Sequence, residues 1–473
     1  MINTGALIIV VIYLAGMLGV GWYTNKYLIK NSTDYLLAGR GLGAIMVACS
    51  LSANNIGGGS TVGLAGKAFG DWGMSAVWYV LAAAIGIIPM AFFAPRLRKV
   101  LAFTIPEVVG RRFGPTAHII TAVLNIISLF CLTASQVLAS GIIISVLVGV
   151  NIKLAILVAG LITITYTAMG GLLADAFTDL FQWVIIFFGL LICLPFIING
   201  AGGWEAVVSK VPPAKMAFNG IGILTVISLI IQYFITFMSG PEMVSRIYAA
   251  KDEKTGKKAV LLSALFMALF AFIPAIIGIV ASAAVPDVKS NLALATVVFK
   301  YSPSLIAGLV CAAIIASTMS SADSNMLCAS TIFTKDIYQK YFNPKISDKA
   351  IITMTRFGNI IIGLGAMSIA LFQLNIITLN IFAFMLRAAG PFAAFVLALT
   401  WKHATRSAGL VSIICGSVAG IYWQLIKEPF GLLAIVFGTS IGLISFVITV
   451  LIERNIPGRE APPLKELESE EII

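Results

Sequence analysis

The sequence predicts an all-α, polytopic membrane protein. Hydrophobic residues make up 59% of the 473 residues and charged residues only 11%, with a mean hydropathy of +1.01, which excludes a soluble globular protein. A membrane-spanning helix needs about 20 largely apolar residues. The chain contains thirteen such stretches, at 5–28, 43–68, 71–95, 116–149, 153–172, 175–200, 221–250, 258–285, 304–337, 350–372, 375–400, 405–424 and 428–452.

The distribution of basic residues predicts the topology. If the N-terminus lies outside, the basic clusters at 96–112 and 246–258 and most other Lys and Arg residues face the cytoplasm, as the positive-inside rule requires. We therefore expect a multi-pass protein of the plasma (inner) membrane with an outside N-terminus and a cytoplasmic C-terminus. This topology accounts for the formal net charge of +11. The expected partners are the lipid bilayer and a small-molecule solute, with no nucleic acid, and the protein is expected to work as a monomer.

The stretch 43–68 is interrupted in its middle. Residues 54–60 read Asn-Asn-Ile-Gly-Gly-Gly-Ser, and each glycine destabilises a helix by about 1 kcal/mol relative to alanine. A broken span is tolerated only where the freed backbone is buried in protein or lines a cavity. Its carbonyl groups can then hold a cation and its N–H groups a polar solute. The alternative is close helix packing through small residues.

The stretch 304–337 carries a stripe of hydroxyl groups. Ser317, Ser320, Ser321 and Ser324 stand at i, i+3, i+4 and i+7 on one helix face, with Asp323 at its edge. Such groups are costly at mid-membrane depth unless they face a site. A lone serine more often bonds back to its own helix or allows close packing. Four on one face favour a site for a hard cation such as Na⁺, which prefers oxygen ligands.

Two further stretches carry polar or helix-breaking residues. Asp175, at the edge of the stretch 175–200, is consistent with a helix cap, whereas Asp179, a turn further in, is expected to share a cation with the serine stripe. Pro241 breaks the stretch 221–250. Breaks in the second and seventh stretches predict an internal repeat of five helices plus five, with one helix before and two after. The predicted organisation is 1–42 (N-terminal helix and link), 43–200 (first repeat), 201–400 (second repeat), 401–455 (two C-terminal helices) and 456–473 (cytoplasmic tail).

No feature of the sequence indicates an enzyme. It contains no Gly-x-x-x-x-Gly-Lys-Ser/Thr loop, no His or Cys cluster with metal-ligand spacing and no nucleophile beside a base. His118 and His403 lie near the ends of apolar stretches and are expected at the membrane interface. An ion-driven secondary transporter needs only a cation site and a solute site that share one broken helix.

Several motifs resemble the sodium:solute symporter family, whose members include sodium-coupled proline, galactose, sialic acid and pantothenate transporters. The resemblance rests on residues 53–56, the link 104–113, Gly170-Gly171 with the following Thr178-Asp179-x-x-Gln182, and Ser320-Ser321 with the downstream run 330–338. It implies the inverted-repeat fold of the bacterial leucine transporter, with thirteen helices.

The resemblance also implies the ion sites. The main Na⁺ site would consist of the carbonyl groups of Ala53, Ile56 and Ser317 and the hydroxyl groups of Ser320 and Ser321. Some members hold a further Na⁺ at the positions of Asp179, Ser320, Asp323 and Ser324, although Asp323 stands where the sialic acid branch has a hydroxyl group. One Na⁺ is expected, and a second is left open. Alternatively, Asp323 pairs with Arg387 and no second ion binds.

The predicted solute site lies at the two broken helices. N–H groups of a glycine-rich turn suit a carboxylate, so a small carboxylate or amino acid is favoured over a sugar. Arg387 needs a partner, which is Glu242, Asp323 or a solute carboxylate. The predicted solute-binding residues are Asn55, Gly57, Gly58, Gly59, Ser60, Gln136, Phe234, Phe237, Met238 and Arg387.

The predicted function is Na⁺-coupled symport of a small organic solute by alternating access. The alternatives are a sodium-coupled sugar symporter and an ion-independent uniporter or solute sensor on the same fold.

Overall fold

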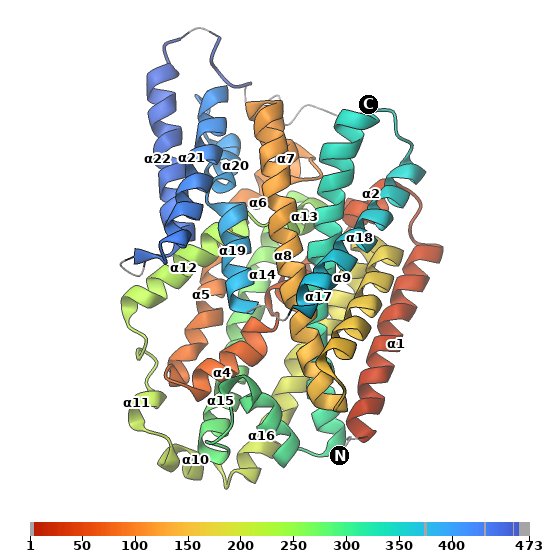
Figure 1. Cartoon of the computed structure of the whole chain (residues 1–473), viewed down its shortest axis with the longest axis vertical. Coiled ribbons are helices and arrows are strands. Elements are labelled where there is room, and N and C mark those ends of the chain that lie inside the picture. Colours follow the sequence, from red (N-terminus) through yellow and green to blue (C-terminus); the bar gives the residue numbers. More distant parts are fainter. Residues whose placement is uncertain (1–3, 373–375, 430–431, 457, 463–473) are drawn as a thin grey trace.

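The computed structural model describes residues 4–372, 376–429, 432–456 and 458–462, and within them the regular secondary structure is helical, joined by turns and short irregular connections (Figure 1). The first half contains α1 (Thr4–Tyr27), α2 (Ser32–Leu37), η1 (Ala38–Arg40), α3 (Ala44–Asn55), η2 (Gly59–Gly63), α4 (Leu64–Phe69), η3 (Gly73–Val77), α5 (Trp78–Gly86), α6 (Met90–Val100), α7 (Ile105–Phe113), α8 (Pro115–Val148), α9 (Ile152–Gly200), α10 (Trp204–Lys210) and α11 (Pro213–Met216). The second half contains α12 (Ile223–Met238), α13 (Pro241–Ala249), α14 (Glu253–Phe270), α15 (Phe272–Ala284), η4 (Ser290–Leu292), α16 (Ala293–Tyr301), α17 (Ser304–Ile332), η5 (Phe333–Phe342), α18 (Asp348–Leu371), α19 (Ile376–Ala388), α20 (Pro391–Thr400), α21 (Arg406–Leu425) and α22 (Ala434–Glu453).

Most of the long helices are suited to cross a membrane. Among the described residues, nine helices are long and apolar enough to do so, or eleven if each of two bent helix pairs is one span. One bent pair is α12 with α13, which meet at 58° around the predicted break at Pro241. The other joins η3 and α5 to α6 at 43°, next to Pro89. This bend lies within the apolar stretch 71–95, and no break was predicted there.

The helix α9 consists of two helical segments rather than one. Its 49 residues would extend over about 75 Å, more than twice the thickness of a bilayer core. The helix is broken at Gly171, whose backbone has φ 54° and ψ −158°. A side chain at this position would overlap the carbonyl oxygen of Tyr35, so only glycine fits. The boundary expected between the stretches 153–172 and 175–200 therefore exists as a chain reversal within α9.

The predicted interruption of the second stretch is confirmed. The helix α3 ends at Asn55, and Ile56 leaves the helical region with φ −87° and ψ 67°. After two non-helical glycines, the π-helical turn η2 leads into the short helix α4. The break thus lies between two helical halves inside the protein, where its backbone atoms are available to neighbouring helices.

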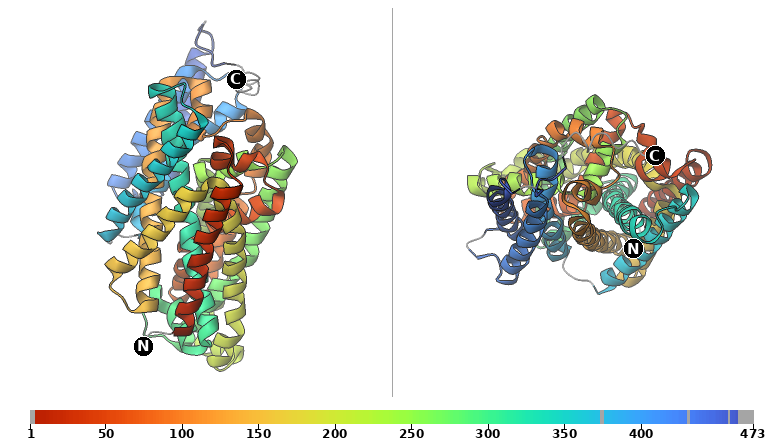
Figure 2. Two further views of the ribbon diagram at one scale, coloured as in Figure 1. Left: turned by 90° about the vertical axis from the view of Figure 1, so that its right-hand side faces the viewer. Right: turned by 90° about the horizontal axis from the view of Figure 1, so that it is seen from above.

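The helix α17 lies at the centre of the bundle, packed against α1, α3, α8, α9 and α18 (Figures 1 and 2). Every residue from Val310 to Ile332 is buried, including the whole serine stripe. The opposite arrangement holds on the outside of the bundle, where large apolar side chains such as Ile12, Phe92 and Leu224 are exposed. The polar residues of α17 therefore face protein rather than lipid.

A buried polar junction joins three elements at the upper end of the bundle in Figure 1. Asp336 of η5 accepts a hydrogen bond from the hydroxyl group of Thr104, the residue that caps α7, at 2.9 Å. It also lies 2.7 Å from Nε2 of His118, near the start of α8. His118 is fully buried within the protein, near the start of α8.

Candidate functional site

The broken end of α3 meets the serine stripe of α17. The hydroxyl group of Ser320 donates to the carbonyl oxygen of Ala53 at 2.9 Å, and that of Ser321 donates to the carbonyl oxygen of Asn54 at 2.8 Å. Both hydroxyl oxygens also lie within 3.5 Å of the carbonyl oxygen of Ser317. The structure thus gathers four of the five residues expected to bind the main Na⁺, and the fifth, Ile56, caps the same end of α3 and is buried. A set of hydroxyl and carbonyl oxygens suits a hard monovalent cation.

A second polar cluster surrounds the guanidinium group of Arg246 on α13. Its Nη2 lies 2.9 Å from Asp175 and 3.0 Å from Asp179, both on the second half of α9, and also donates to Ser324 of α17. Its Nε donates to Ser50 of α3 at 2.7 Å. All five side chains are buried. Asp175 is therefore an ion-pair partner inside the bundle, and the helix-cap interpretation is wrong.

Asp323 lies beside this cluster but does not contact Arg246. It accepts hydrogen bonds from the hydroxyl group of Tyr166 on α9 and from the backbone N–H of Ser324, and the hydroxyl group of Ser324 lies 3.3 Å from carboxyl oxygens of both Asp323 and Asp175. Arg387 of α19 instead binds both carboxylate oxygens of Glu242, at 2.6 and 2.7 Å. The alternative in which Asp323 pairs with Arg387 is therefore wrong, and Glu242 is the partner among the three that were considered.

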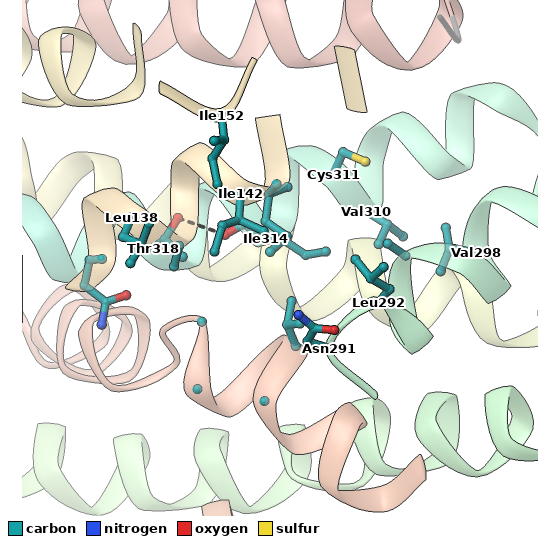
Figure 3. Close-up of a pocket in the computed structure, with 18 of the residues that line it drawn as sticks. Leu138, Ile142, Ile152, Asn291, Leu292, Val298, Val310, Cys311, Ile314 and Thr318 are labelled. Atoms are coloured by element: carbon teal, nitrogen blue, oxygen red, sulfur yellow. Dashed lines mark hydrogen bonds between the residues drawn. The ribbon is translucent and has the colours of Figure 1, made fainter. Parts of the chain in front are cut away.

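A cavity of about 480 Å³ opens next to the broken helix (Figure 3). Its walls come from the turn around Gly58 and Gly59 and from α8, η4, α16, α17 and α19. Of the predicted solute-binding residues, only Gly58, Gly59 and Gln136 line it. Asn55, Gly57 and Ser60 belong to the adjoining segment of backbone without lining the cavity. The remaining four lie elsewhere: Phe234 packs on Phe392, Phe237 on Tyr233, Met238 is fully buried, and Arg387 pairs with Glu242.

Gly57 connects the ion-site residues to the cavity. A methyl group added to its Cα would lie 3.1 Å from the hydroxyl oxygen of Ser321 and 3.3 Å from Oε1 of Gln136. Ser321 belongs to the predicted ion site, and Gln136 lines the cavity. The two sites are therefore separated by a single backbone residue of the broken helix.

The sequence suggested no role for Ser50 and Tyr166, and the expectation that Arg246 belongs to a basic cluster facing the cytoplasm is wrong, because its side chain is fully buried and paired with Asp175 and Asp179. Arg246 carried a usable signal, because a charged residue near the break of an apolar stretch calls for a buried partner. Ser50 and Tyr166 carried none, since isolated serine and tyrosine residues are common in membrane helices. Their partners are distant in sequence, at separations of 196 residues from Ser50 to Arg246 and 157 from Tyr166 to Asp323.

Broken membrane helices that enclose buried polar groups define a secondary-transporter fold, and comparison with solved structures supports this class. A Na⁺-coupled sialic acid symporter in a substrate-bound, outward-open state superimposes with a TM-score of 0.84 over 97% of this chain and 99% of that chain, at 20% identity. Mhp1, a nucleobase-cation-symport-1 family transporter, matches with a TM-score of 0.60 over 93% and 99% of the two chains, at 16% identity. These similarities establish the fold alone.

The family follows from the sequence comparison. Residues 35–416 match the model of the sodium:solute symporter family, so the chain belongs to that family of membrane transporters. The osmoregulated proline transporter OpuE of Bacillus subtilis (strain 168) is 27% identical over 470 residues, covering 94% of each chain. A sodium/proline symporter of Staphylococcus aureus (strain NCTC 8325 / PS 47) is 26% identical over 474 residues, covering 95% of this chain and 92% of the relative.

Proposed function

We propose that this protein couples the inward movement of Na⁺ to that of a small carboxylate or amino acid, by alternating access across the plasma membrane. The observation that carries the proposal is the contact between α17 and the broken end of α3, where the hydroxyl groups of Ser320 and Ser321 meet the carbonyl groups of Ala53 and Asn54. Sodium would take these same oxygens as ligands, joined by the carbonyl groups of Ile56 and Ser317. The proline transporters among the relatives support an amino-acid-like solute.

The coupling follows from the position of Gly57. An ion held at Ser321 would fix the backbone on one side of this residue, and the same backbone positions Gly58 and Gly59 at the wall of the cavity. Ion binding would therefore stabilise the solute-binding form of the turn, and solute binding would stabilise the ion-binding form.

We propose a single Na⁺ per solute. Oδ2 of Asp179 and the hydroxyl oxygen of Ser324, two of the ligands that a second ion would need, already bind the guanidinium group of Arg246. A second Na⁺ at this position would lie next to a buried like charge, which is strongly unfavourable in a medium of low dielectric constant. Arg246 thus supplies the positive charge that a second ion would otherwise bring.

The proposed topology has thirteen spans arranged as a five-plus-five inverted repeat, with the N-terminus outside. The eleven spans counted above include both bent pairs. Division of α9 at Gly171 adds one span, and α3 with α4, taken as one broken span, adds another. The breaks at Gly57–Gly58 and at Ser239–Gly240 then fall in the first helix of each repeat.

Uptake into proteoliposomes tests the proposal. The purified full-length protein should accumulate labelled L-proline or another small carboxylate under an inward Na⁺ gradient, and not under a K⁺ gradient of equal size. The Na⁺ dependence should be hyperbolic, with a charge-to-solute ratio that corresponds to one ion. Solute uptake that is indifferent to Na⁺ would instead support the uniporter, and Na⁺-dependent uptake confined to sugars would support the sugar symporter.

A further inference from the structure

The cavity beside Gly58 and Gly59 is lined mainly by hydrocarbon. Its walls include Leu138 and Ile142 of α8, Leu292 and Val298 next to and on α16, and Val310 and Ile314 of α17 (Figure 3). A volume of about 480 Å³ lies within the range of pockets that enclose a small ligand completely. A solute with no hydrocarbon body would leave these walls in contact with water, and burial of apolar surface would then contribute nothing to its binding free energy.

The cavity offers uncharged hydrogen-bonding groups next to the broken helix. Oε1 of Gln136 is buried and has no hydrogen-bond partner within the described chain. The backbone N–H groups of Gly57 and Gly58 have no backbone acceptor among the described residues. Thr318 turns its methyl group to Gly58, at 3.2 Å from the position that a Cβ atom would take there, and its hydroxyl group is already bonded to Ser140 and to its own helix. Free N–H groups at a helix break suit one carboxylate, and the amide oxygen suits one donor on the solute.

Beyond the N–H groups of the turn and the amide oxygen of Gln136, the cavity has no partner for a further charged group. None of its lining residues in the described chain is Asp, Glu, Lys, Arg or His. The buried ions nearest the site, Arg246 and Arg387, are already paired with carboxylates. A dicarboxylate, a dibasic solute or a phosphate would therefore bury an unpaired charge, which is costly. A sugar would bury several hydroxyl groups against aliphatic walls.

From these features we infer that the solute class is the aliphatic monocarboxylates, including aliphatic α-amino acids, whose hydrocarbon body fills the cavity while the carboxylate binds at the turn 57–59. This inference rests on the proposed function and narrows its substrate. Each methylene group that becomes buried should improve the affinity about fourfold, until the cavity is full. Charged or hydroxylated bodies of the same length should bind more weakly.

Thermal stability of the purified full-length protein tests the inference, with each probe compared in NaCl and KCl at equal ionic strength. The probes are the series acetate, butyrate and hexanoate, the series glycine, 2-aminobutyrate and norleucine, and succinate and glucose. In at least one series, the concentration that gives a half-maximal Na⁺-dependent shift should fall about fourfold per methylene group. Equal potency along both series, or tighter binding of succinate or glucose, would overturn the inference while leaving Na⁺-coupled transport in place. No Na⁺-dependent shift with any probe would remove the proposed function itself, and the inference with it.

A matched pair of variants on α8 localises the effect. Ile142→Trp fills the cavity, whereas Ile127→Trp places the same side chain on the exposed outer face of the same helix, where Ile127 is 42% exposed. In the Ile142→Trp variant, the affinity for hexanoate or norleucine should fall at least tenfold, while the stabilisation by Na⁺ alone should be unchanged. The second should behave as the natural protein. An unchanged chain-length preference in Ile142→Trp would show that the hydrocarbon body binds elsewhere.

Discussion

At the scale of single residues, Ser320 and Ser321 show how uncharged groups would supply the ligands of the proposed ion site. Each donates to a different carbonyl group of the same α3 terminus, and both approach the carbonyl oxygen of Ser317. In the absence of an ion, the hydroxyl hydrogens satisfy these carbonyl groups. When a cation takes the same carbonyl oxygens, the hydroxyl groups need only rotate to offer their own oxygens. The site can therefore fill and empty without leaving a buried polar atom unpaired.

Alanine at Ser320 or Ser321 should weaken Na⁺ binding. Each substitution removes one oxygen ligand, and a hydrogen bond or contact to a charged group contributes about 1.5–3 kcal/mol, so the Na⁺ concentration for half-maximal uptake should rise by about 10-fold or more. Ser368→Ala is the control, because Ser368 lies on the exposed face of α18 and bonds only to its own helix. Na⁺ titration of uptake in proteoliposomes gives the comparison, and equal half-saturation in the Ser320 variant and the control would contradict the assigned ion site.

The Arg387–Glu242 pair should behave as a single unit in stability measurements. Arg387→Met or Glu242→Leu alone leaves one buried charge without a partner and should destabilise the protein by about 3–5 kcal/mol. The double variant removes both charges and should recover most of this loss. Thermal unfolding in detergent, followed by fluorescence-detected size exclusion, provides the double-mutant cycle. Additive losses in the double variant would show that the two groups act independently.

At the scale of elements, both functional breaks lie where the backbone cannot continue a regular helix. Glycines follow α3, and Pro241 starts α13. The halves on either side remain packed, and at the α3 break the carbonyl groups of Ala53 and Asn54 accept hydrogen bonds from α17 instead of facing lipid. The break at Gly171 is of another kind, because it reverses the chain and builds two spans from one continuous run of helix.

Alanine at Gly57 should disturb both ligands at once. Its methyl group would come within 3.1 Å of the Ser321 hydroxyl oxygen and 3.3 Å of Gln136 Oε1, so both neighbours must shift. We expect at least a tenfold loss in apparent affinity for Na⁺ and for the solute, measured in the same uptake assay. Gly16→Ala on α1, where nothing lies within 4 Å, should change neither. A Gly57→Ala variant with normal Na⁺ affinity and weakened solute binding would show that the turn does not link the two sites.

At the scale of the whole molecule, the apolar side chains are exposed on the outer surface, where lipid would contact them, and the polar residues of α17 are buried at the centre, where the proposed ion site lies. The helix α17 is enclosed by its neighbours, and its residues 310–332 are all buried. An arrangement of this kind allows the ion and the solute to be bound at mid-depth while the outer helices remain fixed in the bilayer.

The proposed orientation can be tested with single cysteines in loops of opposite predicted sides. Lys289 precedes η4 and Lys254 lies at the start of α14, so the variants Lys289→Cys and Lys254→Cys each place a thiol near the end of a span. In intact cells, a membrane-impermeant maleimide should label the first variant, whereas the second should react only after lysis. The six natural cysteines are buried or half-buried, so the background should be low. The reverse pattern of labelling would place the N-terminus in the cytoplasm.

Much of this architecture could be predicted from the sequence because it depends on local properties. Runs of apolar residues predicted the spans, and consecutive glycines and Pro241 predicted the breaks in α3 and α12–α13. The bend at Pro89 was missed because it lies inside an otherwise uniform apolar stretch. The partners of Arg246 and Asp323 were out of reach, and Glu242 was one of three candidates for Arg387, since each pair joins different helices and depends on how the helices are rotated against one another. For the same reason, periodicity predicted that the serine stripe shares one face but not which groups lie opposite to it.

The junction of Thr104, His118 and Asp336 has a consequence for how the protein moves. Hydrogen bonds among these three side chains link α7, the beginning of α8 and the π-helical segment η5 after α17, at one end of the bundle. A rearrangement that opens this end of the bundle must either move the three segments together as a rigid body or break these hydrogen bonds. Breaking them would leave the buried carboxylate of Asp336 without its partners. Rigid-body movement costs less free energy. We therefore expect the hinges in the short connections at 101–103 and 343–347 beside these segments, rather than within the segments.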